Sequence, residues 1–133
     1  MRKFSSFYTM LILAFTFVRP SPGVADPGDL DPAFGDSGIV ILDLQDESDY
    51  PNSPAITSDG KIVVVGGHLG STDWDFMVVR YNTDGSLDST FSEDGMLISD
   101  YAGYRDDWID VEVQPDDKIV TAGWEAGDCR LYI

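Results

Sequence analysis

Two short stretches of the sequence are rich in carboxylates that could bind a metal ion. One stretch holds Asp46, Glu47 and Asp49, and the other holds Asp106, Asp107 and Asp110. Clustered carboxylates can bind Ca²⁺, which takes about six to eight oxygen ligands. Neither stretch has the spacing of an EF-hand loop, so solvated turn residues are the simpler interpretation. The sequence therefore designates no metal-binding residue and no cofactor, and calcium stays an alternative.

A third acidic segment, Asn82–Asp88, also resembles the start of a calcium loop. It lacks the glycine at the sixth position and the closing glutamate that such a loop requires. We interpret it as a turn.

His68 is the only histidine, and the position 57 residues later holds Glu125. A catalytic histidine needs a nucleophile or an orienting carboxylate nearby, and the sequence indicates neither. We expect a loop residue without a special role. Motifs of serine hydrolases, P-loop proteins and zinc proteases are absent, so no catalytic residue is designated and the binding residues stay unknown.

Aromatic residues could form a surface on which sugars stack. The candidates are Trp74, Trp108, Trp124, Tyr50, Tyr101 and Tyr104. Large aromatic side chains dominate the cores of small β domains, so core packing is the more ordinary explanation.

Two segments of the sequence recur after a fixed interval. Ser58–Gly66 returns as Pro115–Gly123, and Gly28–Gly38 returns as Gly85–Gly95, both after 57 residues. β-Branched runs bounded by Gly, Pro and Asp indicate strands. The predicted strands are Gly38–Leu44, Asn52–Ser58, Lys61–Gly67, Asp75–Tyr81, Met96–Tyr101 and Ile109–Gln114, with Leu131–Ile133 inside a further one.

Three details of these strands follow from local chemistry. Asp59-Gly60 predicts a type I′ hairpin turn, and the matching turn should be looser because Asp117 replaces the glycine. Pro54 removes a ladder donor, which favours an edge strand. Ile109–Gln114 alternates, which predicts Ile109, Val111 and Val113 on one buried side.

The repeat resembles the delta-60 repeat of exported bacterial proteins. The motifs are Leu30-Asp31 with Phe34-Gly35 and Gly38, Asp59–Gly66 with its counterpart at Pro115–Val120, and Asp75–Tyr81 followed by Asn82–Asp88. The resemblance covers Gly28 to the end of the sequence and implies a propeller-like β array without a catalytic motif. Pro54, Ser92 and Asp117 depart from the pattern, so we expect less regular turns there.

The predicted fold is therefore all-β, with propeller-like repeats of about four antiparallel strands each. Residues 28–84 and 85–133 form just under two repeats, the second truncated. A blade cannot bury its faces alone, and about three repeats are needed for a stable stack. This predicts the N-terminal part of a longer repeat protein, or self-association through open sheet edges.

Residues 1–25 have the pattern of a signal peptide. Arg2-Lys3 is basic, Tyr8–Val18 is an apolar run too short to span a bilayer, and Gly23-Val24-Ala25 offers a cleavage site. Cleavage would remove three of the eight basic residues and none of the 24 acidic ones. So acidic a chain repels nucleic acids and anionic lipids. We expect a secreted or cell-surface protein with no membrane insertion after cleavage.

The single cysteine, Cys129, excludes an internal disulfide and leaves a free thiol or an intermolecular partner. Together these features predict an exported, non-enzymatic β-repeat module that acts as a scaffold or adhesive surface for an unknown protein or glycan. The alternatives are a fragment of a propeller enzyme, of the lactonase or glycan-processing type, and a calcium-stabilised repeat.

Overall fold

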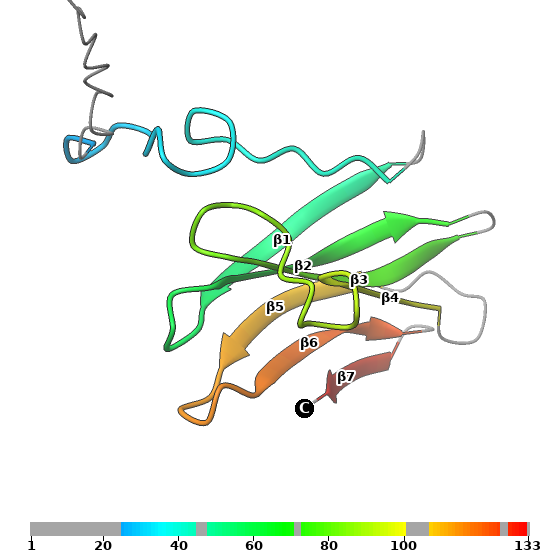
Figure 1. Cartoon of the computed structure of the whole chain (residues 1–133). Coiled ribbons are helices and arrows are strands. Elements are labelled where there is room, and N and C mark those ends of the chain that lie inside the picture. Colours follow the sequence, from blue (N-terminus) through cyan, green and yellow to red (C-terminus); the bar gives the residue numbers. More distant parts are fainter. Residues whose placement is uncertain (1–24, 45–47, 71–72, 101–106, 126–127, 133) are drawn as a thin grey trace, which may run out of the picture.

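All regular secondary structure in the described part of the chain is β-strand (Figure 1). A computed structural model describes residues 25–44, 48–70, 73–100, 107–125 and 128–132. This confirms the all-β prediction. Within these ranges no helix is long and apolar enough to cross a membrane. The predicted signal peptide lies almost wholly outside the described residues and stays a prediction.

The strands form two antiparallel sheets. In the first sheet the order is β1-β2-β3-β4, and the strands are Asp49–Ile56, Ile62–Leu69, Trp74–Tyr81 and Met96–Ser99. In the second sheet the order is β5-β6-β7, and the strands are Asp107–Val113, Ile119–Glu125 and Asp128–Tyr132. Strand β1 lies at an edge, as Pro54 predicted.

The first sheet takes its fourth strand from the second repeat. Strand β4 pairs with β3, from Phe76 opposite Ser99 to Val79 opposite Met96. The equivalent segment of the first repeat, Gly38–Leu44, was predicted to be a strand, and that prediction is wrong. It forms only isolated bridges that join Ile39 to Gly35 and Asp36. The free edge of β3, which such a segment would need, is already occupied by β4.

The two hairpin turns share one geometry that differs from the prediction. Gly60 has a φ of 83°, but Asp59 does not have the positive φ that a type I′ turn requires. Instead the Thr57 amide donates to the Lys61 carbonyl (2.9 Å), as in hairpins with three-residue loops. The second turn is not looser, because Asp117 adopts a φ of 61° and the equivalent hydrogen bond is 2.8 Å long.

Asp117 also links the turns of the two sheets. Its carboxylate accepts hydrogen bonds from the Ser58 amide (2.9 Å) and the Ser58 hydroxyl (2.7 Å). These bonds stabilise the charged form and hold the pKa of Asp117 below its ordinary value. An aspartate at this position therefore supplies a contact between repeats that glycine cannot make.

The end of β2 and the pairing register of β5 also differ from the sequence predictions. Strand β2 continues through His68 and Leu69, so His68 is a strand residue and does not lie in a loop. In β5 the pairing register shifts between Trp108 and Asp110, which breaks the predicted alternation. As a result Val111 is buried, whereas Ile109 is 49% exposed.

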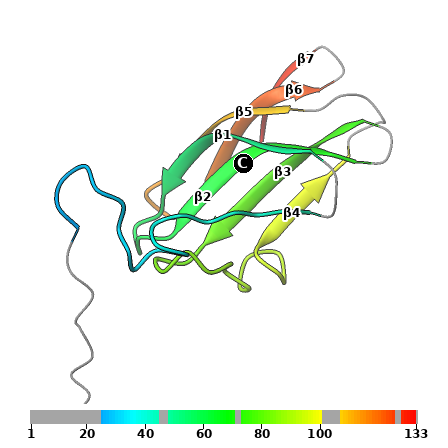
Figure 2. The ribbon, with the colours of Figure 1, turned by 90° about the horizontal axis from the view of Figure 1, so that it is seen from above.

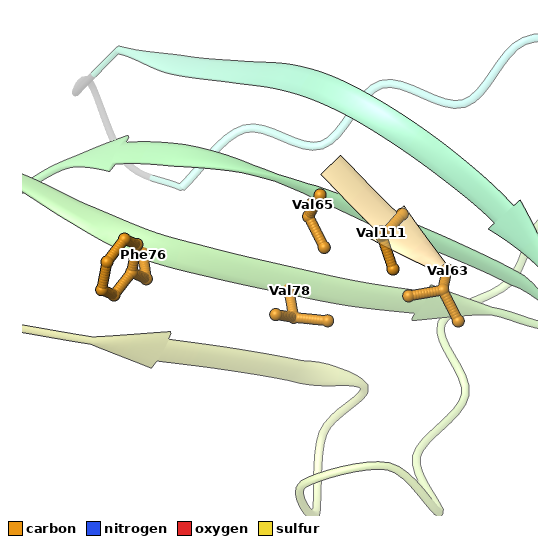
Figure 3. Packing of buried hydrophobic residues seen from close by; sticks show 5 residues of the cluster. All are labelled: Val63, Val65, Phe76, Val78 and Val111. Atoms are coloured by element: carbon orange, nitrogen blue, oxygen red, sulfur yellow. The ribbon is translucent and has the colours of Figure 1, made fainter. Parts of the chain in front are cut away.

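The core lies between the two sheets (Figures 2 and 3). Its central cluster consists of Val63, Val65, Phe76, Val78 and Val111. Val65 and Val78 lie directly opposite each other on neighbouring strands and so share a face. The second sheet contributes Val111, and the Tyr132 ring contacts the Phe76 ring at a centroid distance of 6.1 Å. The first sheet thus buries one face against the second.

The opposite face of the first sheet is covered by the segment that precedes β1. Figures 1 and 2 show this segment, Phe34–Leu44, running over the sheet on the side away from β5–β7. A half-open cavity of about 490 Å³ remains between them. Its apolar lining includes Val40 and Leu42 from the segment and Val64, Met77 and Val79 from the sheet.

A buried carboxylate fastens the turn between β3 and β4. Asp88 is 2% exposed, and its Oδ2 lies 2.7 Å from Arg80 Nε and 3.0 Å from Lys61 Nζ. Its Oδ1 accepts hydrogen bonds from the Thr90 hydroxyl (2.7 Å) and amide (3.1 Å). The hydrogen bonds from Thr90, followed by those from Lys61 and Arg80, hold the pKa of Asp88 far below its ordinary value.

Removing the Phe76 side chain tests the packing of the two sheets. We expect Phe76→Ala to lower the free energy of unfolding by about 3–5 kcal/mol, the usual range for a buried phenylalanine. Ile56→Ala is the control, because Ile56 is 70% exposed; its effect should stay within about 0.5 kcal/mol. Urea unfolding measures both, with the milder Phe76→Leu added if Phe76→Ala does not fold. Equal effects of the Phe76 and Ile56 truncations would contradict the packing.

The lowered pKa of Asp88 predicts acid sensitivity. A carboxyl whose pKa falls on folding contributes stability above its unfolded pKa, about 3.9, and that stability is lost as the pH falls further. Asp88→Asn should therefore destabilise the protein at pH 7, and the difference from wild type should shrink as the pH drops from about 5 towards 2. Urea unfolding across this range, with Asp29→Asn as control, measures it. A difference independent of pH would contradict the assignment.

Candidate functional site at the acidic end of the first sheet

Strand pairing places three ionisable side chains in one row across the first sheet. Asp49 on β1 lies opposite His68 on β2, and His68 lies opposite Asp75 on β3. Directly opposite residues of antiparallel strands point to the same face. The row therefore belongs to the face that the N-terminal segment covers, and Asp49 lines the cavity there.

His68 has an orienting carboxylate, contrary to the sequence expectation. Its Nδ1 lies 2.6 Å from Asp49 Oδ1, and the two side chains are only 14% and 12% exposed. The Leu44 amide donates to the other Asp49 oxygen at 3.2 Å. A carboxylate at Nδ1 fixes the orientation of the imidazole ring, as in acid–base catalysis. Among the described residues, no serine, threonine or cysteine side chain forms a hydrogen bond with His68.

Three carboxylates converge beside this pair. Asp73, Asp75 and Asp100 each offer one oxygen, and these oxygens lie within 4.8 Å of one another. Oδ1 of Asp75 is buried and has no hydrogen-bond partner among the described residues. Burial, followed by the charges of Asp100 and Asp73, raises the pKa of Asp75 above its ordinary value, and His68 opposes the shift.

This cluster has the chemistry of a site for a hard divalent cation. Carboxylate oxygens are the ligands that Ca²⁺ and Mg²⁺ prefer, and water completes the coordination where the protein supplies fewer than about six. A cation there would reduce the repulsion among three negative charges. The pattern Asp73-x-Asp75 was visible in the sequence. Asp100 joins it only through the pairing of β3 with β4.

The acidic stretches singled out from the sequence have different surroundings. Asp46, Glu47 and Asp106 lie outside the described residues, and only the backbone of Asp107 is described. Asp110 accepts a hydrogen bond from the Ser53 hydroxyl at 2.8 Å. In Asn82–Asp88, Asp84 accepts the Ser86 amide and Asp88 pairs with Lys61 and Arg80. That segment is a turn, as predicted.

The aromatic candidates are divided between the sheets. The Tyr50 and Trp74 rings contact each other edge to face on the first sheet, with centroids 4.8 Å apart. Trp124 lies on the second sheet and is 47% exposed, so core packing does not account for it. Tyr101 and Tyr104 lie outside the described residues, and of Trp108 only the backbone is described.

Comparison with known families supports the architecture. Residues 57–91 match the family model of a domain of unknown function, DUF5122, described as a beta-propeller. The match spans β2, β3 and the turn that holds Asp88. No curated protein and no solved structure matches the chain.

Proposed function

We propose that the chain is an exported, non-enzymatic β-repeat module of the delta-60 type that acts as a scaffold or binding surface. The observation that carries the proposal is the face-to-face packing of two repeat-related sheets, which leaves the apolar side chains of Trp124 and Leu131 exposed on the outer face of β6 and β7. The beta-propeller description of the matching family is consistent with this role.

The outer face is defined by the strand pairing. Ala122 lies opposite Leu131, and Trp124 lies opposite Cys129. These residues point away from the first sheet, because Thr121 and Tyr132, their neighbours in sequence, point towards it. Leu131 is 65% exposed and Trp124 is 47% exposed. An exposed indole beside aliphatic side chains suits stacking on a sugar ring or packing into a protein partner.

Charge limits the ligands of this surface. The chain has a formal net charge of −16 and would become more acidic on removal of the predicted signal peptide. Nucleic acids and anionic lipid surfaces are therefore unfavourable partners. Neutral and cationic glycans or proteins remain compatible, and an acidic surface suits an exported protein.

Binding to immobilised polysaccharides tests the proposal. Protein collected from the culture medium is passed over a neutral glucose polymer and a cationic glucosamine polymer. We expect binding to at least one polymer, and a loss of about tenfold or more in affinity for Trp124→Ala, because buried tryptophans commonly contribute more than about 1.4 kcal/mol to binding. Ile56→Ala is the control for an exposed apolar residue of the other sheet.

Two results would count against this role. The binding proposal fails if neither polymer is bound, or if Trp124→Ala and Ile56→Ala bind equally. Export fails if the protein is found only inside the cell or retains residues 1–25 when its N-terminus is determined by mass spectrometry.

A calcium-stabilised repeat is the second candidate function. The convergence of Asp73, Asp75 and Asp100 favours it, together with the buried, unpaired Oδ1 of Asp75. The cation would connect the β2–β3 loop to the residue after β4 and so hold one end of the sheet together.

Removing one carboxylate tests this candidate. Ca²⁺ at about 100 times its dissociation constant should stabilise wild-type protein by about 2.7 kcal/mol. Asp75→Asn should abolish that gain, and without metal it should be at least as stable as wild type because one of three repelling charges is gone. Thermal unfolding in EDTA and then in Ca²⁺ measures both, with Asp29→Asn as control. An equal response of wild type and Asp75→Asn would eliminate this site.

A further inference from the structure

The cavity between the first sheet and the N-terminal segment is elongated. Asp49 and Tyr81 both line it. Asp49 lies opposite His68 on β2, whereas Tyr81 lies opposite Ile62, at the other end of the same strand. At about 3.3 Å per residue, these two ends are roughly 20 Å apart. The cavity therefore follows the strands, and its volume of about 490 Å³ lies in the range of known ligand pockets.

The lining between the two ends is apolar. The sheet contributes Met77 and Val79, which are 4% and 1% exposed, and the N-terminal segment contributes Val40 and Leu42. Of the described residues that line the cavity, only those at its ends, Asp49 and Tyr81, carry polar side-chain groups. A mostly apolar wall with a few placed polar groups is the usual composition of a small-molecule site.

The N-terminal segment is fastened over the cavity near its two ends. The Gly35 amide donates to the Asp84 carbonyl at 2.8 Å, and the Leu44 amide donates to the Asp49 carboxylate at 3.2 Å. Between these two points, residues 40–43 form no backbone–backbone hydrogen bond with another described residue. Such a cover can move away from the sheet without breaking any strand pairing, so a ligand could enter beneath it.

The two ends of the cavity differ in charge. Asp49 is at one end, and Asp75 lies in the same row across the sheet. Lys61 and Arg80 form their ion pairs at the opposite end, next to Ile62 and Tyr81 in the sequence. The end at Asp49 therefore favours a positively charged group and repels a negatively charged one.

Asp49 can accept a further hydrogen bond. An ionised carboxylate has about four lone-pair sites. The contacts with His68 Nδ1 and with the Leu44 amide use one site on each oxygen. An ammonium group at this end of the cavity would thus find an acceptor without displacing either partner.

We propose that the cavity binds an apolar primary amine, with the hydrocarbon chain between the sheet and the N-terminal segment and the ammonium group against Asp49. The chain would bury apolar surface along β2 and β3, and the charged hydrogen bond would set its direction. Fatty acids of the same length are disfavoured, because their carboxylate would meet that of Asp49. The site lies on the first sheet and does not rest on the scaffold function, which uses the outer face of the second sheet.

A matched series of ligands tests the proposal. Octylamine, octanol and octanoate have the same chain and differ in the charge of the head group. Calorimetric titration at about pH 7, where the amine is protonated and aspartate is ionised, measures their affinities. EDTA is present throughout to exclude metal ions from the neighbouring carboxylates. We expect one octylamine per chain, bound about tenfold or more tightly than octanol, and octanoate bound more weakly than octanol.

The Asp49→Asn variant tests the assigned role of the carboxylate. Asparagine keeps the shape and one acceptor oxygen but removes the charge. The affinity for octylamine should fall about tenfold or more, whereas the affinity for octanol should stay unchanged. Asp29→Asn is the matched control, because it changes the net charge equally at an exposed position outside the cavity.

Filling the cavity tests where the chain binds. Leu42→Trp should weaken octylamine and octanol alike by about tenfold or more, because the indole would occupy their space. Ile56→Trp is the control, because Ile56 is 70% exposed and does not line the cavity. Wild-type protein supplies a measurement that needs no folded variant. Octylamine should shift the methyl NMR signal of Met77 and leave those of Val63 and Val65, on the other face of the sheet, nearly unchanged.

Four results would overturn the proposal: no binding of octylamine, octanoate bound as tightly as octylamine, equal losses in Asp49→Asn and Asp29→Asn, or methyl shifts no larger at Met77 than at Val63. Polysaccharide binding by Leu42→Trp should equal that of wild type, because the cavity and the outer face of the second sheet are separate. Failure of the amine site therefore leaves the scaffold function standing, and failure of polysaccharide binding leaves the amine site standing.

Discussion

The structure depends on one constraint. The first sheet carries valine side chains on both faces, so both faces must be covered by other parts of the chain. Strand β2 makes this plain, because Val63 and Val65 are fully buried against the second sheet while Val64 points to the opposite side. The second sheet covers one face with Val111 and its partly buried neighbours. The N-terminal segment covers the other face less closely and leaves a cavity of about 490 Å³. The two faces of the first sheet are therefore packed unequally, closely by the second sheet and loosely by the N-terminal segment.

Polar contacts then fix how the sheets and turns are joined. Asp88, in the turn after β3, brings together Lys61, which precedes β2, and Arg80 of β3 at one buried carboxylate. Between the sheets, Asp117 binds Ser58 and Asp110 binds Ser53. Hydrogen bonds of this kind are directional, whereas apolar packing is not. They specify how the two repeats are aligned, whereas the core cluster stabilises the packing by burying apolar surface.

The acidic end of the first sheet contributes electrostatic repulsion rather than attraction. Asp73, Asp75 and Asp100 repel one another, and burial makes the charge of Asp75 still less favourable. Arrangements of this kind lower stability unless a cation or a proton offsets them, and they are therefore candidates for function. The neighbouring His68 is held by a hydrogen bond to Asp49.

The strands with the strongest local signals could be predicted from the sequence. The β-branched runs of β2, β3 and β6 and the positions of the turns at Gly60 and Asp117 followed from neighbouring residues, because strand propensity and turn chemistry act over a few positions. The geometry of the two turns did not follow, since neither turn has the form that the local sequence predicted. Pro54 likewise marked an edge strand. The all-β class could be derived from these features alone.

The pairing of strands and the contacts between distant side chains depend on the folded arrangement of the chain and could not be predicted from local sequence. Ile39–Leu42 and Met96–Ser99 are alike in sequence, yet only the second finds the edge of β3. Asp100 reaches Asp75, and Asp49 reaches His68, through strand register, which joins residues far apart in the chain. Local propensity carries no information about register across a sheet. The candidate site could not be derived from the sequence for that reason, since pairing between distant strands alone brings its residues together.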